Sequence, residues 1–324
     1  MSPSPLADSE VLDLLSRARG GHRASLARLV SMVERGGDDA RSIGRLAHPM
    51  GGNTFTIGVT GAPGAGKSTL TSALCRVVRA EDDAAVAVLS IDPSSPFSGG
   101  AILGDRVRMT EHTLDPGVFI RSMATRGHLG GLALATPQAV RVLDAVGVPT
   151  VIIETVGVGQ VEVEVAGAAD TVVVVMNPGW GDAVQANKAG LMEIADVFVI
   201  NKADRPGAGD TRRDIEQMLS MRTQSGWRPP VLETVATTGA GIGELWEAIT
   251  AHRAHLVDTI VDGTSGLDAR RRLRVTAELR GVIAAELQER ARLRSTGGDF
   301  ADAVDGVIDR RIDPWTAADA LLGA

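Results

Sequence analysis

A glycine-rich segment between an apolar strand and an amphipathic helix constrains this chain more than any other feature. Residues 61–68 read Gly-Ala-Pro-Gly-Ala-Gly-Lys-Ser. The preceding residues 55–60 have the composition of a buried strand, and residues 67–80 place apolar side chains at helical spacing. A strand, a glycine-rich loop and a helix in this order form a phosphate-binding loop, in which backbone N–H groups and the helix N-terminus face phosphate oxygens. The sequence therefore predicts a P-loop NTPase.

The motif also assigns a task to each of its residues. Its glycines let the backbone approach phosphate oxygens without Cβ clashes. Lys67 is expected to reach the β- and γ-phosphates and to assist catalysis, and Ser68 is expected to bind Mg²⁺. The loop residues predicted to contact the nucleotide are Gly61, Ala62, Pro63, Gly64, Ala65, Gly66, Lys67, Ser68 and Thr69.

A second motif, Asn201-Lys202-Ala203-Asp204, follows the apolar run 195–200 and predicts which base is bound. The Asp204 carboxylate can accept hydrogen bonds from N1–H and the N2 amino group of guanine. Adenine offers neither donor, and a site built on hydrogen bonds rejects an analogue that lacks them. Asn201 would contact N7, the Lys202 stem would lie along the ring, and the Ala236 N–H would bond O6. The motifs therefore predict GTP and GDP as ligands, bound at the base by Asn201, Lys202, Asp204, Val235, Ala236 and Thr237.

Acidic residues follow two predicted strands, 84–91 and 149–153. A carboxylate at the carboxyl end of a strand beside the phosphate loop is well placed to hold Mg²⁺. A further acid and an arginine lie in residues 104–108, a loop expected to move with nucleotide state. The predicted metal ligands are Ser68, Asp92, Asp105 and Glu154, the predicted catalytic residues are Lys67, Asp105 and Arg108, and Gly157 is the predicted γ-phosphate sensor. The alternative for each acid is a cap or a turn, and for Arg108 a surface position.

The residue after Gly157 bears on the rate of hydrolysis. Many small GTPases place a water-orienting glutamine there, whereas this chain has Val158, and the nearest glutamine is Gln160. We therefore predict slow hydrolysis by the isolated protein and acceleration by a partner that orders the switch segments.

The chain is predicted to be an α/β protein in three parts. Residues 1–52 form an N-terminal helical extension, 53–261 the P-loop GTPase domain, and 262–324 a C-terminal helical dimerisation arm. The strands of the central part are continuous apolar runs, which are typical of a mostly parallel sheet flanked by helices. Thr136-Pro137 predicts a helix start that Gly147 ends.

The arm is predicted from a long helical pattern over residues 268–294. Its apolar side chains recur at four-residue steps, at Val275, Leu279, Ile283 and Leu287. Burial of this stripe against a second copy predicts a homodimer. We interpret Arg270, Arg271, Arg272, Arg274 and Arg280 as a solvated cationic face. Trp315 is predicted to anchor two short helices in residues 299–322.

Composition limits the remaining classes. Aromatic residues make up 3% of the chain and the net charge is −7, which argues against nucleic-acid binding. The start has no signal-peptide pattern, no apolar run is long enough for a bilayer, and Cys75 is the single cysteine. We expect a cytoplasmic protein without a membrane partner, and Cys75 in the core.

Several longer stretches resemble the bacterial GTPases that act as chaperones for adenosylcobalamin-dependent methylmalonyl-CoA mutase, whose human counterpart is the methylmalonic aciduria type A protein. The family was once labelled an arginine/ornithine transport ATPase. The resemblance covers most of the chain. Its most specific stretches are residues 90–96 (Ser-Ile-Asp-Pro-Ser-Ser-Pro), 121–131, 154–160 (Glu-Thr-Val-Gly-Val-Gly-Gln) and 177–182, continuing to 201–204.

The resemblance implies a homodimeric GTPase that binds the mutase, gates cobalamin delivery and protects the mutase from inactivation. It also implies that residues 178–188 are a switch that communicates with the mutase, with Asp182, Gln185 and Lys188 as its polar candidates. One departure is Val235-Ala236, where relatives usually show Ser-Ala. Because the expected contact is a backbone N–H, we expect it to survive.

Other readings remain open at this point. An ATP-using kinase or transport ATPase conflicts with Asp204. A metallochaperone GTPase for a nickel enzyme needs a His/Cys cluster, whereas the six histidines are scattered. A nucleotide-dependent scaffold would need the same pocket, and a related client such as isobutyryl-CoA mutase would leave the same sequence pattern.

Overall fold

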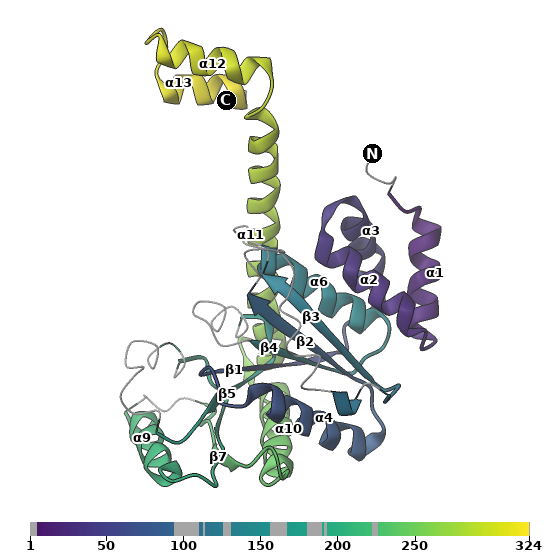
Figure 1. Cartoon of the computed structure of the whole chain (residues 1–324), viewed down its shortest axis with the longest axis vertical. Coiled ribbons are helices and arrows are strands. Elements are labelled where there is room, and N and C mark those ends of the chain that lie inside the picture. Colours follow the sequence, from purple (N-terminus) through teal and green to yellow (C-terminus); the bar gives the residue numbers. More distant parts are fainter. Residues whose placement is uncertain are drawn as a thin grey trace. The chain divides into compact units, whose positions relative to one another are not determined.

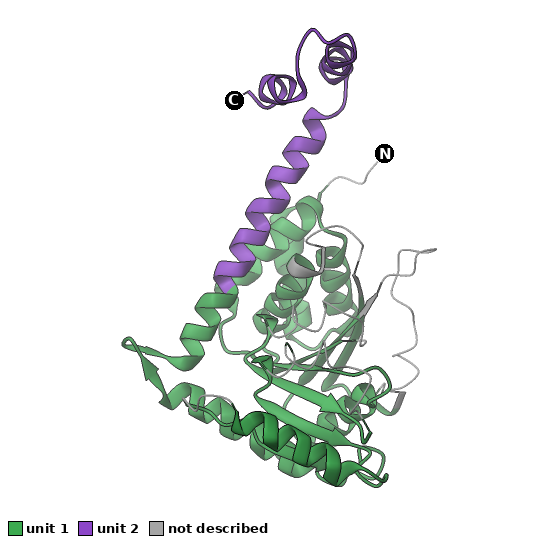
Figure 2. Ribbon diagram, turned by 90° about the vertical axis from the view of Figure 1, so that its left-hand side faces the viewer, with its two compact units in different colours: residues 1–274 green, residues 275–324 purple. Residues whose placement is uncertain are grey.

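The computed structural model describes residues 5–93, 110–112, 114–125, 131–155, 167–179, 190, 193–221 and 226–323 (Figure 1). The chain divides into two compact units, residues 1–274 and 275–324 (Figure 2). The predicted residues Asp105, Arg108, Gly157, Asp182, Gln185 and Lys188 lie outside the described residues.

A parallel sheet of seven strands forms the centre of the first unit, in the order β3-β2-β4-β1-β5-β6-β7. Its strands are β1 (Phe55–Gly61), β2 (Val86–Pro93), β3 (Val118–Thr125), β4 (Thr150–Thr155), β5 (Thr171–Met176), β6 (Val197–Asn201) and β7 (Val231–Thr234). Every residue of β1, β4, β5 and β6 is buried, as apolar strands covered on both faces require. Because all pairs are parallel, the carboxyl ends of these strands meet at one edge. The predicted α/β fold is confirmed.

Helices cover both faces of the sheet. On one face α1 (Asp8–Arg19), α2 (Arg23–Arg35), α3 (Gly37–Ala47) and α6 (Gly131–Ala145) share an apolar core with β2–β4. On the other face α4 (Lys67–Asp82) and α10 (Ile242–Asp258) pack together. Helix α9 (Ala208–Ser220) packs on β5 and β6 from the first face, because Val172 and Val174 point away from the core that holds Val173 and Val175. Strand β2 shows the division directly, because Val88 joins the second core and Leu89 the first. The N-terminal helices are therefore part of the sheet's own core.

The sequence analysis misplaced the start of one helix and did not predict a second helix and one strand. Helix α6 begins at Gly131, so the predicted start at Thr136-Pro137 is wrong, and Pro137 lies inside the helix. Proline costs one backbone hydrogen bond there, which the core residues Val142 and Leu143 offset by complete burial. Helix α3 and strand β3 were not predicted. The polar residues inside β3 obscure its pattern, and one of them, Arg121, pairs with Glu34 of α2 at 2.7 Å.

Helix α11 (Gly266–Arg294) begins in the first unit and ends in the second. The short hairpin of β8 (Ile260–Val261) and β9 (Thr264–Ser265) precedes it, and α12 (Gly298–Ile308) and α13 (Pro314–Leu322) follow it. The interpretation of a solvated arginine face is wrong for Arg270, Arg271 and Arg274, which bind backbone and side-chain oxygens of the first unit.

Two expectations about single residues have opposite outcomes. Trp315 is 82% exposed, so it is no packing anchor within the chain. It lies in the first turn of α13, where Asp313 caps the helix by accepting from the Trp315 and Thr316 N–H groups, and Ala317 is the residue that this helix buries. Cys75 is fully buried as predicted, and burial, with a smaller effect of Glu154, raises the pKa of its thiol to about 12.

Candidate nucleotide site

The phosphate loop connects the end of β1 to the start of α4. Gly61, Gly64 and Gly66 have φ values of +130°, +71° and +90°, in the region that favours glycine. A Cβ on Gly61 would overlap the backbone of Val175 in β5, and a Cβ on Gly66 would lie 2.5 Å from the Asn201 Nδ2. Two of the glycines are therefore required by close packing as well as by conformation.

Lys67 holds its charge inside the loop. Its Nζ donates to the carbonyl oxygens of Gly61 at 2.7 Å and Ala62 at 3.0 Å, and the residue is only 6% exposed. The N-terminus of α4 adds its partial positive charge at the same place. The loop thus combines a buried positive charge with a helix N-terminus, and this combination suits a phosphate group. Pro63, Gly64 and Thr69 lie at its exposed rim.

Ser68, in the first turn of α4, contacts Glu154, which lies near the carboxyl end of β4. The Ser68 hydroxyl donates to Glu154 Oε1 at 2.5 Å, and Glu154 is 1% exposed. Strand β4 brings the carboxylate here because Glu154 lies beside Val59 of β1 and Ser90 of β2. A hydroxyl and a carboxylate are hard oxygen donors of the kind that Mg²⁺ binds, together with waters and phosphate oxygens. Asp92 lies near the end of β2, and its side chain is outside the described part of the structure.

Asn201 ties three loops together. Its Nδ2 donates to Ala65 O of the phosphate loop at 2.8 Å. Its Oδ1 accepts from the Ala236 N–H and from the Thr234 hydroxyl, each at 3.1 Å. The amide NH₂ group carries a second N–H donor besides the one that binds Ala65 O. Sequence analysis assigned Asn201 to the base and missed this structural task.

Lys202 makes a second connection between the base loop and the phosphate loop. It has a left-handed φ of +61°, and its Nζ donates to Gly64 O at 2.7 Å. Asp204, in the following turn, is exposed. The two motifs, which are far apart in the sequence, are therefore in direct contact through Asn201 and Lys202.

The segment after β7 is held by backbone contacts. The Val235 N–H donates to Ala240 O at 3.0 Å, which closes a tight loop with Ala236 buried and Thr237 exposed. Gly241, with φ +76°, closes the loop where a Cβ would overlap Glu233 O. The Ala236 N–H, predicted to bond guanine O6, donates here to Asn201.

A buried hydroxyl pair lies beneath the phosphate loop. Thr155 Oγ1 donates to Thr60 Oγ1 at 3.1 Å, and both residues are 0% exposed. Thr60 precedes Gly61, and Thr155 follows Glu154. Sequence analysis missed this pair, since two threonines 95 residues apart carry no local signal.

The parallel sheet, the phosphate loop at the end of β1 and the base loop at the end of β6 define a P-loop NTPase. Residues 26–296 match the family described as methylmalonyl Co-A mutase-associated GTPase MeaB, and the chain belongs to this family. The protein is accordingly a GTPase, as the recognised resemblance predicted.

Known relatives and a solved structure agree with this assignment. A Pyrococcus abyssi protein named as a GTPase is 48% identical over 96% of this chain and 95% of its own. GTPase ArgK of Escherichia coli is 39% identical over 75% and 76%, and the mouse methylmalonic aciduria type A homolog is 31% identical over 84% and 65%. The crystal structure of a LAO/AO transport system kinase superposes with a TM-score of 0.70 at 27% identity, over 99% of both chains.

Among the described residues, no helix has the length and apolar character needed to cross a bilayer. The part of the chain that the structure describes holds no group of three or more His, Cys, Asp and Glu side chains placed to bind a metal ion.

Proposed function

We propose that this protein is a GTP-dependent chaperone of an adenosylcobalamin-dependent methylmalonyl-CoA mutase, which gates cofactor loading and protects the mutase. The observation that carries the proposal is the single site formed by the phosphate loop, Glu154 and the base loop, in a chain of the mutase-associated GTPase family. The name of the mouse relative supports the same client.

In the proposed complex the phosphate loop and α4 hold the GTP phosphates, and Asp204 selects guanine. Ser68 and Glu154, with Asp92 and Asp105, hold Mg²⁺, which neutralises charge on the β- and γ-phosphates when bound. The contact between the Ser68 hydroxyl and Glu154 supports this assignment, because it brings two hard oxygen donors together where α4 begins and β4 ends.

Hydrolysis is proposed to be slow in the isolated protein and faster with the client. Val158 supplies no water-orienting amide after the predicted phosphate sensor Gly157. Asp105 and Arg108 are proposed to act in catalysis, and Asp182, Gln185 and Lys188 in communication with the mutase. Each of these assignments rests on motif position and family resemblance.

A homodimer is proposed to form through α11. Val275, Leu279, Ile283 and Leu287 are between 51% and 60% exposed, and α11 contains no buried residue. A helix with this much apolar surface gains stability by burying it at about 25 cal/mol per Å², and a second copy of the same stripe is the occupant we propose.

The test is GTP turnover by the purified protein with and without purified methylmalonyl-CoA mutase, with ATP as the control nucleotide. We expect slow GTP turnover, a rise with the mutase, and no ATP turnover. The Asp204→Asn variant controls for the base, since it should lose GTP affinity while its phosphate-loop contacts stay intact. Turnover that ignores the mutase would remove the client, and unchanged guanine selectivity in the variant would overturn the base assignment.

A further inference from the structure

Two buried aspartates lie at the edge of the sheet opposite the nucleotide site. Asp170 directly precedes β5, and its side chain is 0% exposed. Asp196 directly precedes β6, and its side chain is 8% exposed. Buried carboxylates are costly unless they are paired and hydrogen-bonded, so their contacts indicate what they are for.

Each aspartate binds the backbone of the neighbouring strand. Asp170 Oδ2 accepts from the Thr56 N–H of β1 at 2.9 Å, and from the Thr56 hydroxyl at 2.9 Å. Asp196 Oδ2 accepts from the Val172 N–H of β5 at 2.8 Å. A side chain that is hydrogen-bonded to the neighbouring strand opposes sliding of one strand along the other. The two aspartates therefore fix the register, or stagger, of β1, β5 and β6 relative to one another.

The first turns of α11 supply the cations that hold these carboxylates. Arg270 donates to Asp196 Oδ2 at 2.6 Å and to Oδ1 at 2.7 Å, and also to Asp170 O at 2.6 Å. Arg274 donates to Asp170 Oδ1 at 2.9 Å and to the Thr56 hydroxyl at 3.1 Å. Burial opposes the charge of Arg270, but the hydrogen bonds and charge of Asp196 outweigh it and raise the pKa of the guanidinium.

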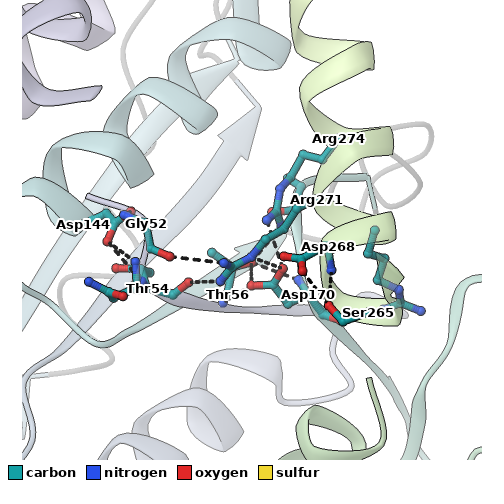
Figure 3. Close-up of polar contacts among 12 residues, drawn as sticks. Gly52, Thr54, Thr56, Asp144, Asp170, Ser265, Asp268, Arg271 and Arg274 are labelled. Atoms are coloured by element: carbon teal, nitrogen blue, oxygen red, sulfur yellow. Dashed lines mark hydrogen bonds and ion pairs between the residues drawn. The ribbon is translucent and has the colours of Figure 1, made fainter. Parts of the chain in front are cut away.

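A third arginine of α11 binds the residues just before β1. Arg271 donates to Gly52 O and Thr54 O, each at 3.1 Å, while the N–H groups of Gly52 and Thr54 bind the Asp144 carboxylate (Figure 3). Figure 3 shows Arg271 and Arg274 reaching from α11 towards the same short stretch of β1 and Asp170. We call Arg270, Arg271 and Arg274 the arginine clamp.

The stagger that the clamp holds matters at the far ends of the same strands. Gly61 lies opposite Val175 of β5, with no room for even a Cβ. At the end of β6, Asn201 reaches Ala65 O of the phosphate loop at 2.8 Å. Because interiors are close-packed and strands are stiff, a shift at one end of a short buried strand reaches the other end. For the five residues of β6 that span is about 16 Å.

We propose that Arg270 and Arg274 are positioning residues for the nucleotide site. They act through Asp196 and Asp170, which set the stagger of the strands that carry the phosphate loop and the base loop. The inference rests on the proposed nucleotide site and adds residues of α11 to it that make no contact with the two loops.

The experiment compares Arg270→Gln with the double variant Arg270→Gln/Asp196→Asn, and uses Arg280→Gln as the control. Arg280 lies on the same helix and is exposed. The double variant removes both charges, so it leaves no unpaired buried carboxylate and folds even where the single variant does not. Melting temperatures and affinities for fluorescent GTP and GDP analogues are measured for each, the affinities well below each melting temperature.

We expect the single variant to melt earlier, the double variant to recover most of that loss, and both to bind GTP about tenfold more weakly. The control should stay within about twofold of the wild type. A purely structural role predicts a lowered melting temperature but wild-type affinity in the folded protein, and that result in the double variant would overturn the inference. Failure of the wild type to bind GTP would instead overturn the nucleotide site itself, and the inference with it.

Discussion

The substitution Gly61→Ala tests how tightly the phosphate loop is packed on the sheet. Gly61 has φ +130°, and its added Cβ would lie 2.8 Å from both the carbonyl carbon and the amide nitrogen of Val175, and closer still to its oxygen. Gly64, three residues along the same loop, also has a positive φ of +71°, but a Cβ there meets no atom within 4 Å. The pair separates backbone conformation from packing.

The two costs can be estimated from general values. A left-handed conformation costs a residue with a Cβ roughly 1–2 kcal/mol, and this applies to both variants. Forcing extra volume into a packed interior adds about 1–3 kcal/mol, and this applies only to Gly61, because the overlapped atoms are backbone atoms of β5. We therefore expect Gly61→Ala to lower the free energy of unfolding by about 2–5 kcal/mol, against about 1–2 kcal/mol for Gly64→Ala.

The assay is urea unfolding of the nucleotide-free protein, followed by far-ultraviolet circular dichroism. Nucleotide is left out because a variant that bound it more weakly would also lose the stability that a bound ligand adds. The slope of the unfolding free energy against urea should not change, since the surface exposed on unfolding is the same. Equal destabilisation by the two substitutions would refute the reasoning, because it would mean that β1 and β5 accommodate the Cβ without cost.

Three further outcomes follow from the described contacts. Ser68→Ala should raise the Mg²⁺ concentration for half-maximal GTP turnover at least about tenfold, and an unchanged Mg²⁺ titration would remove Ser68 from the metal site. Burial lowers the pKa of His252 from 6.5 to about 4. Between these two pH values the imidazole is therefore protonated in the unfolded chain but neutral in the folded protein. The free energy of unfolding is therefore unaffected by His252 above pH 6.5, and it falls by about 3 kcal/mol as the pH is lowered to 4. His252→Gln should remove this part of the pH dependence in urea midpoints measured between pH 4 and 7.5, and a parallel decline in wild type and variant would contradict it. Leu279→Asp with Ile283→Asp should halve the particle mass in light scattering at micromolar concentration, and an unchanged mass would reject the α11 interface.

Local patterns in the sequence were sufficient for the class of fold and for the two loops of the site. The phosphate loop and the base loop are contiguous motifs, and each is directly flanked in the sequence by a recognisable strand or helix. The apolar runs at β1, β5 and β6 are read from consecutive residues, because a strand covered on both faces is apolar throughout. Helix α6 shows the limit of such reading: a proline that predicts a helix start lies within a helix that core packing maintains.

Contacts between distant residues were decided by the tertiary structure alone. Ser68 meets Glu154 because β4 lies beside β1 in the sheet, and nothing in either segment specifies that neighbour. The arginines of α11 looked like a solvated face because helical periodicity does not reveal which strand ends will face them. Their partner Asp170 lies 104 residues before Arg274. Propensity and turn chemistry act over a few residues, whereas strand order and the pairing of buried charges are set by how the whole core packs.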